Sequence, residues 1–206
     1  MINDIFEVVL AFFVLTITAM TIQNAVLARA LGVERLISLI DDTTNTIVFG
    51  VLLTIVTMLS SVFYYLLNLF VLSDLSFRNY LKPLAMVLCM GLAFIIVFIL
   101  TVKFAPYEHL AKAVSALPVA TFNCTVIGTL LIAFSVTRNY SLSNTIAYGI
   151  GSSIGFMLAV LLVTEGQRKL RNRSVPSAFK GLPVTLLFLA GLAMAIYGLT
   201  GHTFSF

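Results

Sequence analysis

Long stretches without a charged residue alternate with short polar segments along this chain of 206 residues. Each stretch has at least the roughly 20 residues that an α-helix needs to cross about 30 Å of hydrocarbon. The uncharged runs lie at 8–28, 46–72, 83–102, 114–137, 139–164 and 181–201. They predict six transmembrane helices, the first of which is interrupted by Gln23 and Asn24.

Composition supports a membrane location for the whole chain. Hydrophobic residues make up 60% of it and charged residues only 10%, and its mean hydropathy is +1.09. A soluble domain of this size could not bury that much apolar surface. We therefore expect an all-α integral membrane protein with a single membrane domain over 1–206. Because the chain opens with Asp4 and Glu7 rather than with basic residues, we expect the first segment to be retained and not cleaved as a signal peptide.

The distribution of Lys and Arg predicts an orientation. Between the fifth and sixth runs the basic residues are Arg168, Lys169, Arg171, Arg173 and Lys180. Cytoplasmic loops carry such an excess, so the 165–181 loop is predicted to be cytoplasmic, in a multi-pass protein of the cell (inner) membrane. With six spans, both termini then face outward. A lipid headgroup or a partner protein explains this basic loop better than a nucleic acid does.

Two similar heptapeptides indicate an internal repeat. "TNTIVFG" at 44–50 and "SNTIAYG" at 143–149 are separated by 99 positions, and the same shift places Asn24 on Asn123. Three crossings end on the side opposite to where they began, so a three-helix repeat must be inverted. We predict two inverted repeats, at about 1–105 and 106–206, with helices 1 and 4 broken at the two asparagines. Functional sites in such proteins lie near mid-membrane, where broken helices meet.

The amides of Asn24 and Asn123 require partners, because an unpaired amide in hydrocarbon costs several kcal/mol. In one interpretation they satisfy backbone groups that are freed where a helix breaks. In the other they form hydrogen bonds between helices, worth about 0.6–2 kcal/mol each. Their matched positions in the two repeats favour the first interpretation.

Other polar and small residues have simpler explanations. "GIGSSIG" at 149–155 is not preceded by a strand, and its Gly151 and Gly155 are typical of a helix-packing face. The hydroxyl residues of the second run should also pack, or alternatively line an ion path: Thr54, Thr57, Ser60 and Ser61. Glu165 is predicted to form a solvated ion pair. We expect solvated carboxylates in the first connection at Glu34, Asp41 and Asp42, and His202 is given no role.

Both cysteines lie in apolar runs, so no disulfide framework is expected. Two thiols cannot complete a four-ligand metal site within one chain. Cys89 should pack as a small hydrophobic residue. Cys124 directly follows Asn123 at the predicted break, so packing and metal binding both stay open for it. No catalytic or nucleotide-binding constellation is visible, and the chain alone is not predicted to be an enzyme.

Three segments carry a resemblance to a known family: "FNCTVIG" at 122–128, "YGIGSSIGFMLAVLLVTEGQRKL" at 148–170 and "VPSAFKGLPVTLLFLAGLAMAIYGLTG" at 175–201. They resemble the A subunit of the Rnf electron-transport complex and are similar to the E subunit of the sodium-translocating NADH:quinone reductase. The resemblance covers nearly the whole chain. It implies an integral membrane component of an ion-translocating oxidoreductase (translocase) complex, in which electrons cross the membrane in coupling to Na⁺ or H⁺ translocation. The implied partners are a homologous subunit of opposite orientation and further subunits that carry flavin and iron–sulfur centres.

The resemblance also implies a [2Fe–2S] cluster shared with the homologous partner, with two cysteines from each protein. Cys124 is then a candidate ligand, and Asn123 and Asn24 support the broken helices. The first repeat departs from this pattern, because "NAVLARALGVE" at 24–34 places Glu34 where the family has a cysteine. A carboxylate is a harder donor than a thiolate. A three-cysteine site, cluster loss, or a cluster supplied differently by partners would each explain this departure.

Two functions of other classes compete with electron transfer. Inverted repeats with broken helices are equally typical of small secondary transporters without a redox role. A structural membrane subunit that has lost its cluster is the third hypothesis.

Overall fold

The structure is a computed structural model that describes residues 2–40, 43–72, 78–104, 107–135, 141–170, 176 and 179–200. Within these ranges the regular elements are helices, and no strand occurs. In chain order they are α1 (Ile2–Met20), α2 (Val33–Leu39), α3 (Thr43–Leu67), the π-helical η1 (Asn68–Leu72), α4 (Arg78–Phe104), α5 (Tyr107–Thr121), α6 (Cys124–Ser135), α7 (Leu142–Leu170) and α8 (Leu182–Thr200). The all-helical prediction is confirmed.

Several of these helices are long and apolar enough to cross a membrane. Three meet both conditions in the described part of the chain: Asn45–Leu72, Tyr80–Phe104 and Leu142–Leu170. The pair Leu110–Thr121 and Cys124–Phe134 is bent by 45° and makes a fourth if it counts as one span. The apolar parts of α1 and α8 are shorter. A helical membrane protein is therefore established, whereas the number of six spans stays a prediction.

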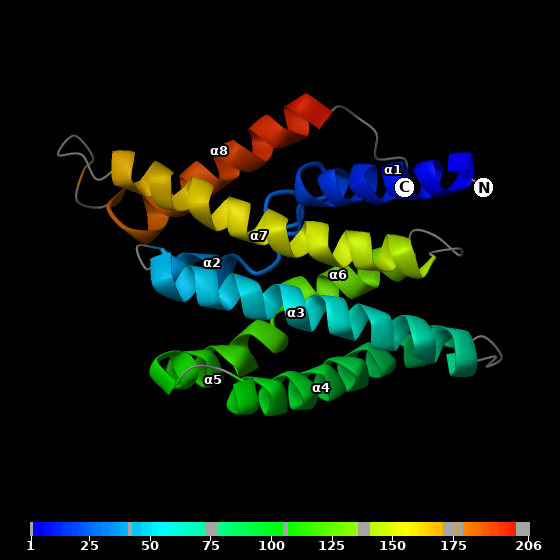
Figure 1. Cartoon of the computed structure of the whole chain (residues 1–206). Helices are drawn as coiled ribbons and strands as arrows, with labels where there is room; N and C mark the ends of the chain where they lie inside the picture. The colour runs from blue at the N-terminus through cyan, green and yellow to red at the C-terminus, as the bar shows by residue number, and fades with distance from the viewer. Residues whose placement is uncertain are drawn as a thin grey trace.

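Figure 1 shows how the helices are arranged along the molecule. The long helices α3 and α7 run side by side through its centre, and they pack closely on each other. Elsewhere two shorter helices cover the same length between them: α1 with α2, and α6 with α5. Both interruptions lie near the middle of α3 and α7, so two non-helical segments are brought to the same depth.

Small residues on α7 allow α1 to approach its backbone closely. A Cβ atom added to Gly155 would lie 2.8 Å from the Met20 carbonyl oxygen, and one added to Gly151 would collide with the Thr16 carbonyl. Neither contact leaves room for a side chain, because backbone atoms cannot move aside as a flexible side chain can. The helix-packing face predicted from "GIGSSIG" is confirmed.

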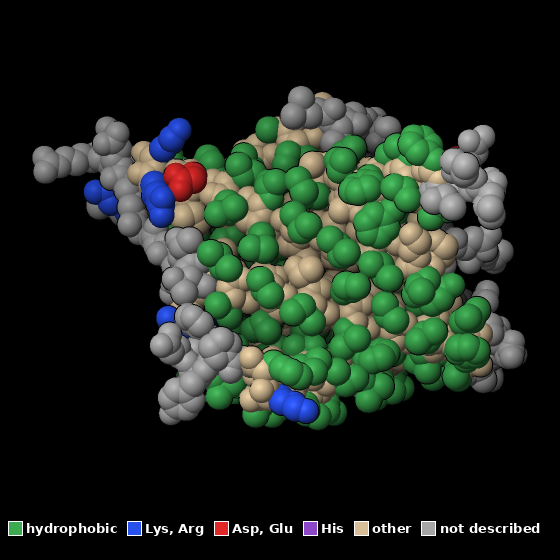
Figure 2. All heavy atoms as spheres, in the orientation of Figure 1, with side chains coloured by type: hydrophobic (Ala, Val, Ile, Leu, Met, Phe, Trp, Pro, Cys, Tyr) green, Lys and Arg blue, Asp and Glu red, His purple; other side chains and the backbone are tan. Residues whose placement is uncertain are grey.

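The outer surface is that of a protein solvated by lipid. Large apolar side chains are exposed on several helices, among them Phe13 on α1 and Leu187 and Met194 on α8, with Met194 75% exposed. Figure 2 shows hydrophobic side chains covering most of the visible face, while the visible Lys, Arg and Glu side chains lie toward the end where α7 ends. Exposed apolar surface of this extent marks contact with lipid or with partner helices.

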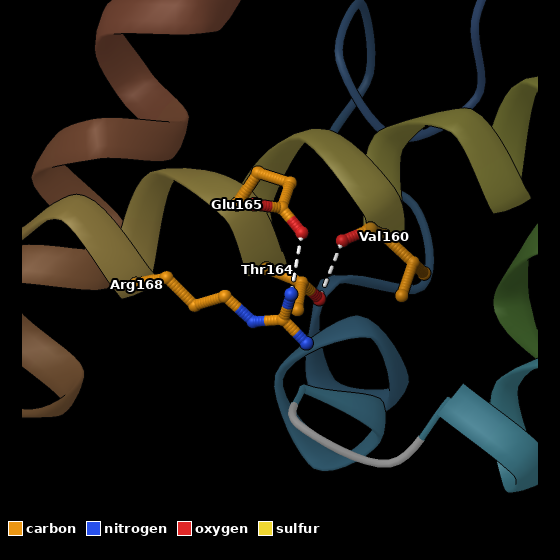
Figure 3. A network of polar contacts seen from close by, with 4 residues as sticks. All are labelled: Val160, Thr164, Glu165 and Arg168. Carbon is orange, nitrogen blue, oxygen red and sulfur yellow. Dashed lines mark hydrogen bonds and ion pairs between the residues drawn. The ribbon is translucent and has the colours of Figure 1, made fainter.

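At that end, Glu165 and Arg168 form an ion pair with a separation of 2.8 Å between carboxylate and guanidinium (Figure 3). Their side chains are 62% and 53% exposed, so the predicted solvated ion pair is confirmed. Other residues considered in the sequence lie outside the described ranges, namely Asp41, Asp42, Arg171, Arg173 and His202.

Candidate functional site

The first interruption, between α1 and α2, is organised by Asn24. Its amide nitrogen donates hydrogen bonds to the carbonyls of Met20 (2.9 Å) and Gly155 (2.8 Å). Its side-chain oxygen accepts from the backbone N–H groups of Val26 (2.9 Å) and Leu27 (3.1 Å). Asn24 is fully buried, and both its donors and its acceptor are used. These bonds satisfy backbone groups that the end of α1 leaves open, and one of them ties the interruption to α7.

The second interruption, between α5 and α6, places Asn123 directly before α6. The side-chain oxygen of Asn123 accepts the N–H of Thr125 at 3.1 Å, which makes Asn123 the N-cap of that helix. The residue is buried, yet its amide nitrogen has no hydrogen-bond partner in the described part of the chain. Asn24 and Asn123 therefore occupy comparable interruptions, but their hydrogen bonding differs.

The two interruptions touch each other. Gly32, with φ +77°, lies against the Asn123 side chain, and an added Cβ would be 3.2 Å from its Oδ1 and would collide with the Thr125 hydroxyl. Only glycine adopts this conformation without strain, and only glycine fits the space. The Leu31 side chain fills the position that a side chain at Gly128 would need. Glycines thus allow the first interruption to pack on the beginning of α6.

A pocket of about 470 Å³ opens where the two interruptions meet. Its lining residues come from both of them: Ala30, Leu31, Gly32, Val33, Glu34, Arg35, Ser38, Val119, Phe122, Asn123 and Cys124. Cys124 is exposed and is the first residue of α6, whereas Glu34 is exposed in the first turn of α2. The structure therefore brings the candidate thiol and the residue that replaces the expected second cysteine to one pocket.

This pocket has charged side chains and an amide in its lining, unlike the neighbouring apolar groove. A groove of about 990 Å³ between α3, η1 and α4 is lined almost entirely by apolar side chains, including Cys89 and Phe122. Cys89 is buried in the apolar core, which confirms its predicted packing role. Phe122 lines both hollows, so it stands between the polar pocket and the apolar groove.

The hydroxyl residues of α3 mostly bond to their own helix. Thr54, Thr57 and Ser61 each donate to the carbonyl four residues earlier, at 2.8, 2.6 and 2.7 Å. Ser60 is fully buried, and its hydroxyl has no partner among the described residues. These bonds are those of packing residues, and the alternative of an ion path stays a prediction.

The sequence interpretation missed Arg35, which lines the pocket next to Glu34. Its guanidinium carbon lies 4.9 Å from the centre of the Phe49 ring, and its Nη1 donates to Ser38 Oγ at 3.1 Å. A signal for it was present, because Arg35 directly follows Glu34, the residue that stands in place of the expected cysteine. The interpretation of Glu34 as a simply solvated carboxylate did not predict that the Glu34 and Arg35 side chains share one pocket.

No group of three or more His, Cys, Asp and Glu side chains that could hold a metal ion occurs in the described ranges. Within the pocket this chain offers one thiol and one carboxylate. Cys124 is exposed at this pocket, whereas Asn123 Nδ2 is buried beneath the surface and has no hydrogen-bond partner among the described residues. The chain thus supplies one of the two thiolates that the resemblance implies, with a carboxylate, which is a harder donor, in place of the other.

Comparison with known proteins identifies the family. The family model described as "Rnf-Nqr subunit, membrane protein" matches residues 12–203. The chain is 31% identical over 185 residues to the A subunit of the Na(+)-translocating ferredoxin:NAD(+) oxidoreductase complex of Acetobacterium woodii, covering 90% of this chain and 94% of that protein. It is also 31% identical over 195 residues to the E subunit of the Na(+)-translocating NADH-quinone reductase of Proteus mirabilis, covering 91% and 96%. The A subunit of the ion-translocating oxidoreductase complex of Aliivibrio fischeri is 27% identical over 190 residues, covering 92% and 96%. With nearly its whole length matched, this chain belongs to the Rnf-Nqr subunit family of membrane proteins.

Proposed function

We propose that this chain is an integral membrane subunit of an ion-translocating electron-transport complex of the Rnf/Nqr type. Its relatives carry the names of components of such complexes and match over nine-tenths of the chain. The structural observation that carries the proposal is the exposed Cys124 thiol on a pocket built from two helix interruptions. On its own the chain is non-catalytic, and the reaction belongs to the assembled complex.

We propose further that the chain spans the membrane six times as two inverted repeats, 1–105 and 106–206. The order of elements supports this: an interrupted helix pair is followed by two further helices in each half. A shift of 99 residues carries Thr43, where α3 begins, onto Leu142, where α7 begins. In this arrangement both termini lie outside, and the 165–181 loop lies in the cytoplasm. The homologous partner protein has the opposite orientation.

In the proposed site, Cys124 provides one thiolate ligand to a [2Fe–2S] cluster shared with the homologous partner. Glu34, on the same pocket, is the second donor that this chain can offer. When bound, such a cluster accepts and releases one electron at a time. The function of the chain is then to hold a redox centre inside the membrane, between donors and acceptors on other subunits.

The residues around the pocket position the donors. Asn123 caps α6 and so fixes the first turn, on which Cys124 lies. Asn24 fixes the first interruption through its bonds to α1 and α7, and Gly32 lets that interruption approach Asn123. These contacts help to hold the two donors at one pocket, although they come from different halves of the chain.

Iron content of the complex purified with its membrane partners tests this proposal. Cys124→Ser should lower the iron content by the amount of one cluster, and the variant should remain in the complex because Cys124 is exposed and contributes little to packing. Cys89→Ala is the matched control, since it removes the buried thiol outside the pocket lining and should leave iron unchanged. Unchanged iron in Cys124→Ser would remove Cys124 from the site. Solute uptake into liposomes without any redox partner would instead favour a secondary transporter.

A further inference from the structure

The interruption between α1 and α2 holds an arginine beside the middle of α7. Asn24, near its beginning, donates a hydrogen bond to the Gly155 carbonyl, and a Cβ added to Gly32, near its end, would lie 3.0 Å from the Phe156 ring. Helix α7 is long and apolar enough to cross the membrane, and Gly155 and Phe156 lie at the midpoint of its 29 residues. Because Arg29 lies between these two anchored positions, it is held at mid-membrane depth (Figure 1).

Residues 28–30 of this interruption are exposed and have unused polar groups. Ala28, Arg29 and Ala30 are each exposed, and their carbonyl oxygens accept no hydrogen bond from the described residues. The Arg29 guanidinium likewise has no ion pair among those residues. Ala30 has φ +56°, a left-handed conformation that is unfavourable for a residue with a side chain. Strained backbone of this kind is concentrated at functional sites and at contacts with ligands.

Lipid alone would leave these groups of the interruption unsatisfied. Non-helical backbone occurs at membrane depth only where protein or water covers it, because hydrocarbon offers no donors to free carbonyls. Charged side chains at this depth pair with one another or face a water-filled cavity. An arginine side chain is shorter than the roughly 15 Å from the bilayer centre to the headgroups, so it does not carry its charge out of the hydrocarbon.

The surface around the segment suits a protein partner better than a water-filled channel. Ala28 borders a hollow of about 380 Å³ that is lined mostly by apolar side chains of the interruption and of α8, including Met194. Ala30 borders the pocket of about 470 Å³ that also contains Cys124. The neighbours of Arg29 in the chain thus border an apolar hollow on one side and a polar pocket on the other. Apolar contact area combined with an arginine is typical of protein interfaces.

We propose that a neighbouring membrane subunit of the complex covers residues 28–30 and presents a carboxylate to Arg29 at mid-membrane depth. The inference rests on one part of the proposed function, membership of a multi-subunit complex, and does not depend on a cluster. A carboxylate accepts two parallel hydrogen bonds from the planar guanidinium and neutralises its charge. Donors on the same partner satisfy the free carbonyls. The partner segment is therefore embedded in the membrane and carries an Asp or Glu near its middle.

Three variants, each in the complete complex, test the ion pair. Arg29→Met keeps the apolar stem without the charge, and Arg29→Lys keeps the charge without the planar fork. Lys103→Met is the control, because Lys103 is an exposed cation in the last turn of α4. The measurement is the rate at which this chain leaves the complex in detergent, with the complex immobilised through a tag on another membrane subunit.

Arg29→Met should raise this dissociation rate at least about tenfold, because it leaves the partner's carboxylate buried without its counter-ion. Arg29→Lys should stay within about threefold of the wild type, since it keeps the charge but loses the second parallel hydrogen bond. Lys103→Met should dissociate at the wild-type rate. A rate that does not change in Arg29→Met overturns the inference.

Photo-crosslinking from position 28 covers the case in which Arg29→Met fails to assemble, because it leaves Arg29 intact. With Ala28 replaced by p-benzoylphenylalanine, the complex in its membrane should give an adduct with one other membrane subunit, close to an Asp or Glu within a span. The same replacement at Ile99, an exposed residue of α4, should not give this adduct. Adducts with lipid only, with a second copy of this chain or with a peripheral subunit overturn the inference, and so does the absence of any adduct.

An exchange of charges then tests the pair itself. Arg29→Glu alone should dissociate faster than the wild type, and replacing the crosslinked acid of the partner by Arg in the same complex should restore slow dissociation. The proposed function and this inference fail in different ways. A chain that purifies with no other membrane subunit refutes both, whereas a chain that purifies in the complex but is crosslinked only to lipid from position 28 refutes the inference alone.

Discussion

Replacing Asn24 by Ala should destabilise the protein far more than the same replacement at Asn123, although the two asparagines occupy equivalent positions in the sequence repeat. The Asn24 side chain makes four hydrogen bonds, to Met20, Gly155, Val26 and Leu27. The Asn123 side chain makes one, to the backbone of Thr125. The two substitutions are therefore chemically matched but remove very different numbers of bonds.

The magnitude follows from these bonds. At about 1 kcal/mol for each hydrogen bond, the two variants differ by about 3 kcal/mol in the free energy of unfolding. Hydrogen bonds inside membrane proteins average about 0.6 kcal/mol, which reduces the difference to about 2 kcal/mol. Loss of an N-cap costs about 0.5–2 kcal/mol, and in Asn123→Ala the single bond to Thr125 already represents this loss.

Reversible unfolding in mixed detergent micelles, followed by circular dichroism, measures this difference. The midpoint of Asn24→Ala should fall clearly below that of Asn123→Ala, and both should fall below the wild type. Equal midpoints, or a lower one for Asn123→Ala, would refute the reasoning that the first interruption depends on the Asn24 side chain. Asn24→Asp should not rescue the protein, because it keeps the acceptor for Val26 and Leu27 but sets a second carboxylate oxygen against the buried carbonyl oxygens of Met20 and Gly155.

Four further predictions concern the pocket, the surface and the orientation. Gly32→Ala should lower the free energy of unfolding by at least the roughly 1–2 kcal/mol that a left-handed backbone costs a non-glycine residue, and it should lower the iron content of the complex. Its control, Gly191→Ala, has open space around the added Cβ and should be neutral or slightly stabilising in the same unfolding assay. Glu34→Cys should raise the iron content after reconstitution, because a second soft donor then lines the pocket; a decrease would show that the carboxylate itself is needed. Neutralising Glu165 should change the unfolding free energy by no more than about 0.5 kcal/mol, because its ion pair with Arg168 is exposed. A reporter fused to the C-terminus should be active only on the outer face of the membrane, and a cytoplasmic signal would reverse the proposed orientation.

The sequence alone was sufficient for features that depend on local pattern. Uncharged runs of membrane length predicted the helical membrane protein, and α3, α4 and α7 coincide with three of those runs. Asn24 and Asn123 lie where the helices are interrupted, because an amide inside an apolar run needs hydrogen-bond partners and an interruption frees backbone groups that can provide them. The packing face at Gly151 and Gly155 was likewise predictable from the spacing of small residues.

Only the tertiary structure decided what surrounds the pocket. Glu34 and Cys124 belong to different halves of the chain, and they share a pocket because Gly32 packs against Asn123 and Thr125. No local pattern predicts the unequal bonding of the two asparagines. The same holds for the buried Nε of Arg35, which has no partner among the described residues. Hydrophobic runs and helix breaks arise from neighbouring residues, whereas the partner of a buried polar atom depends on which distant segment the packed helices bring against it.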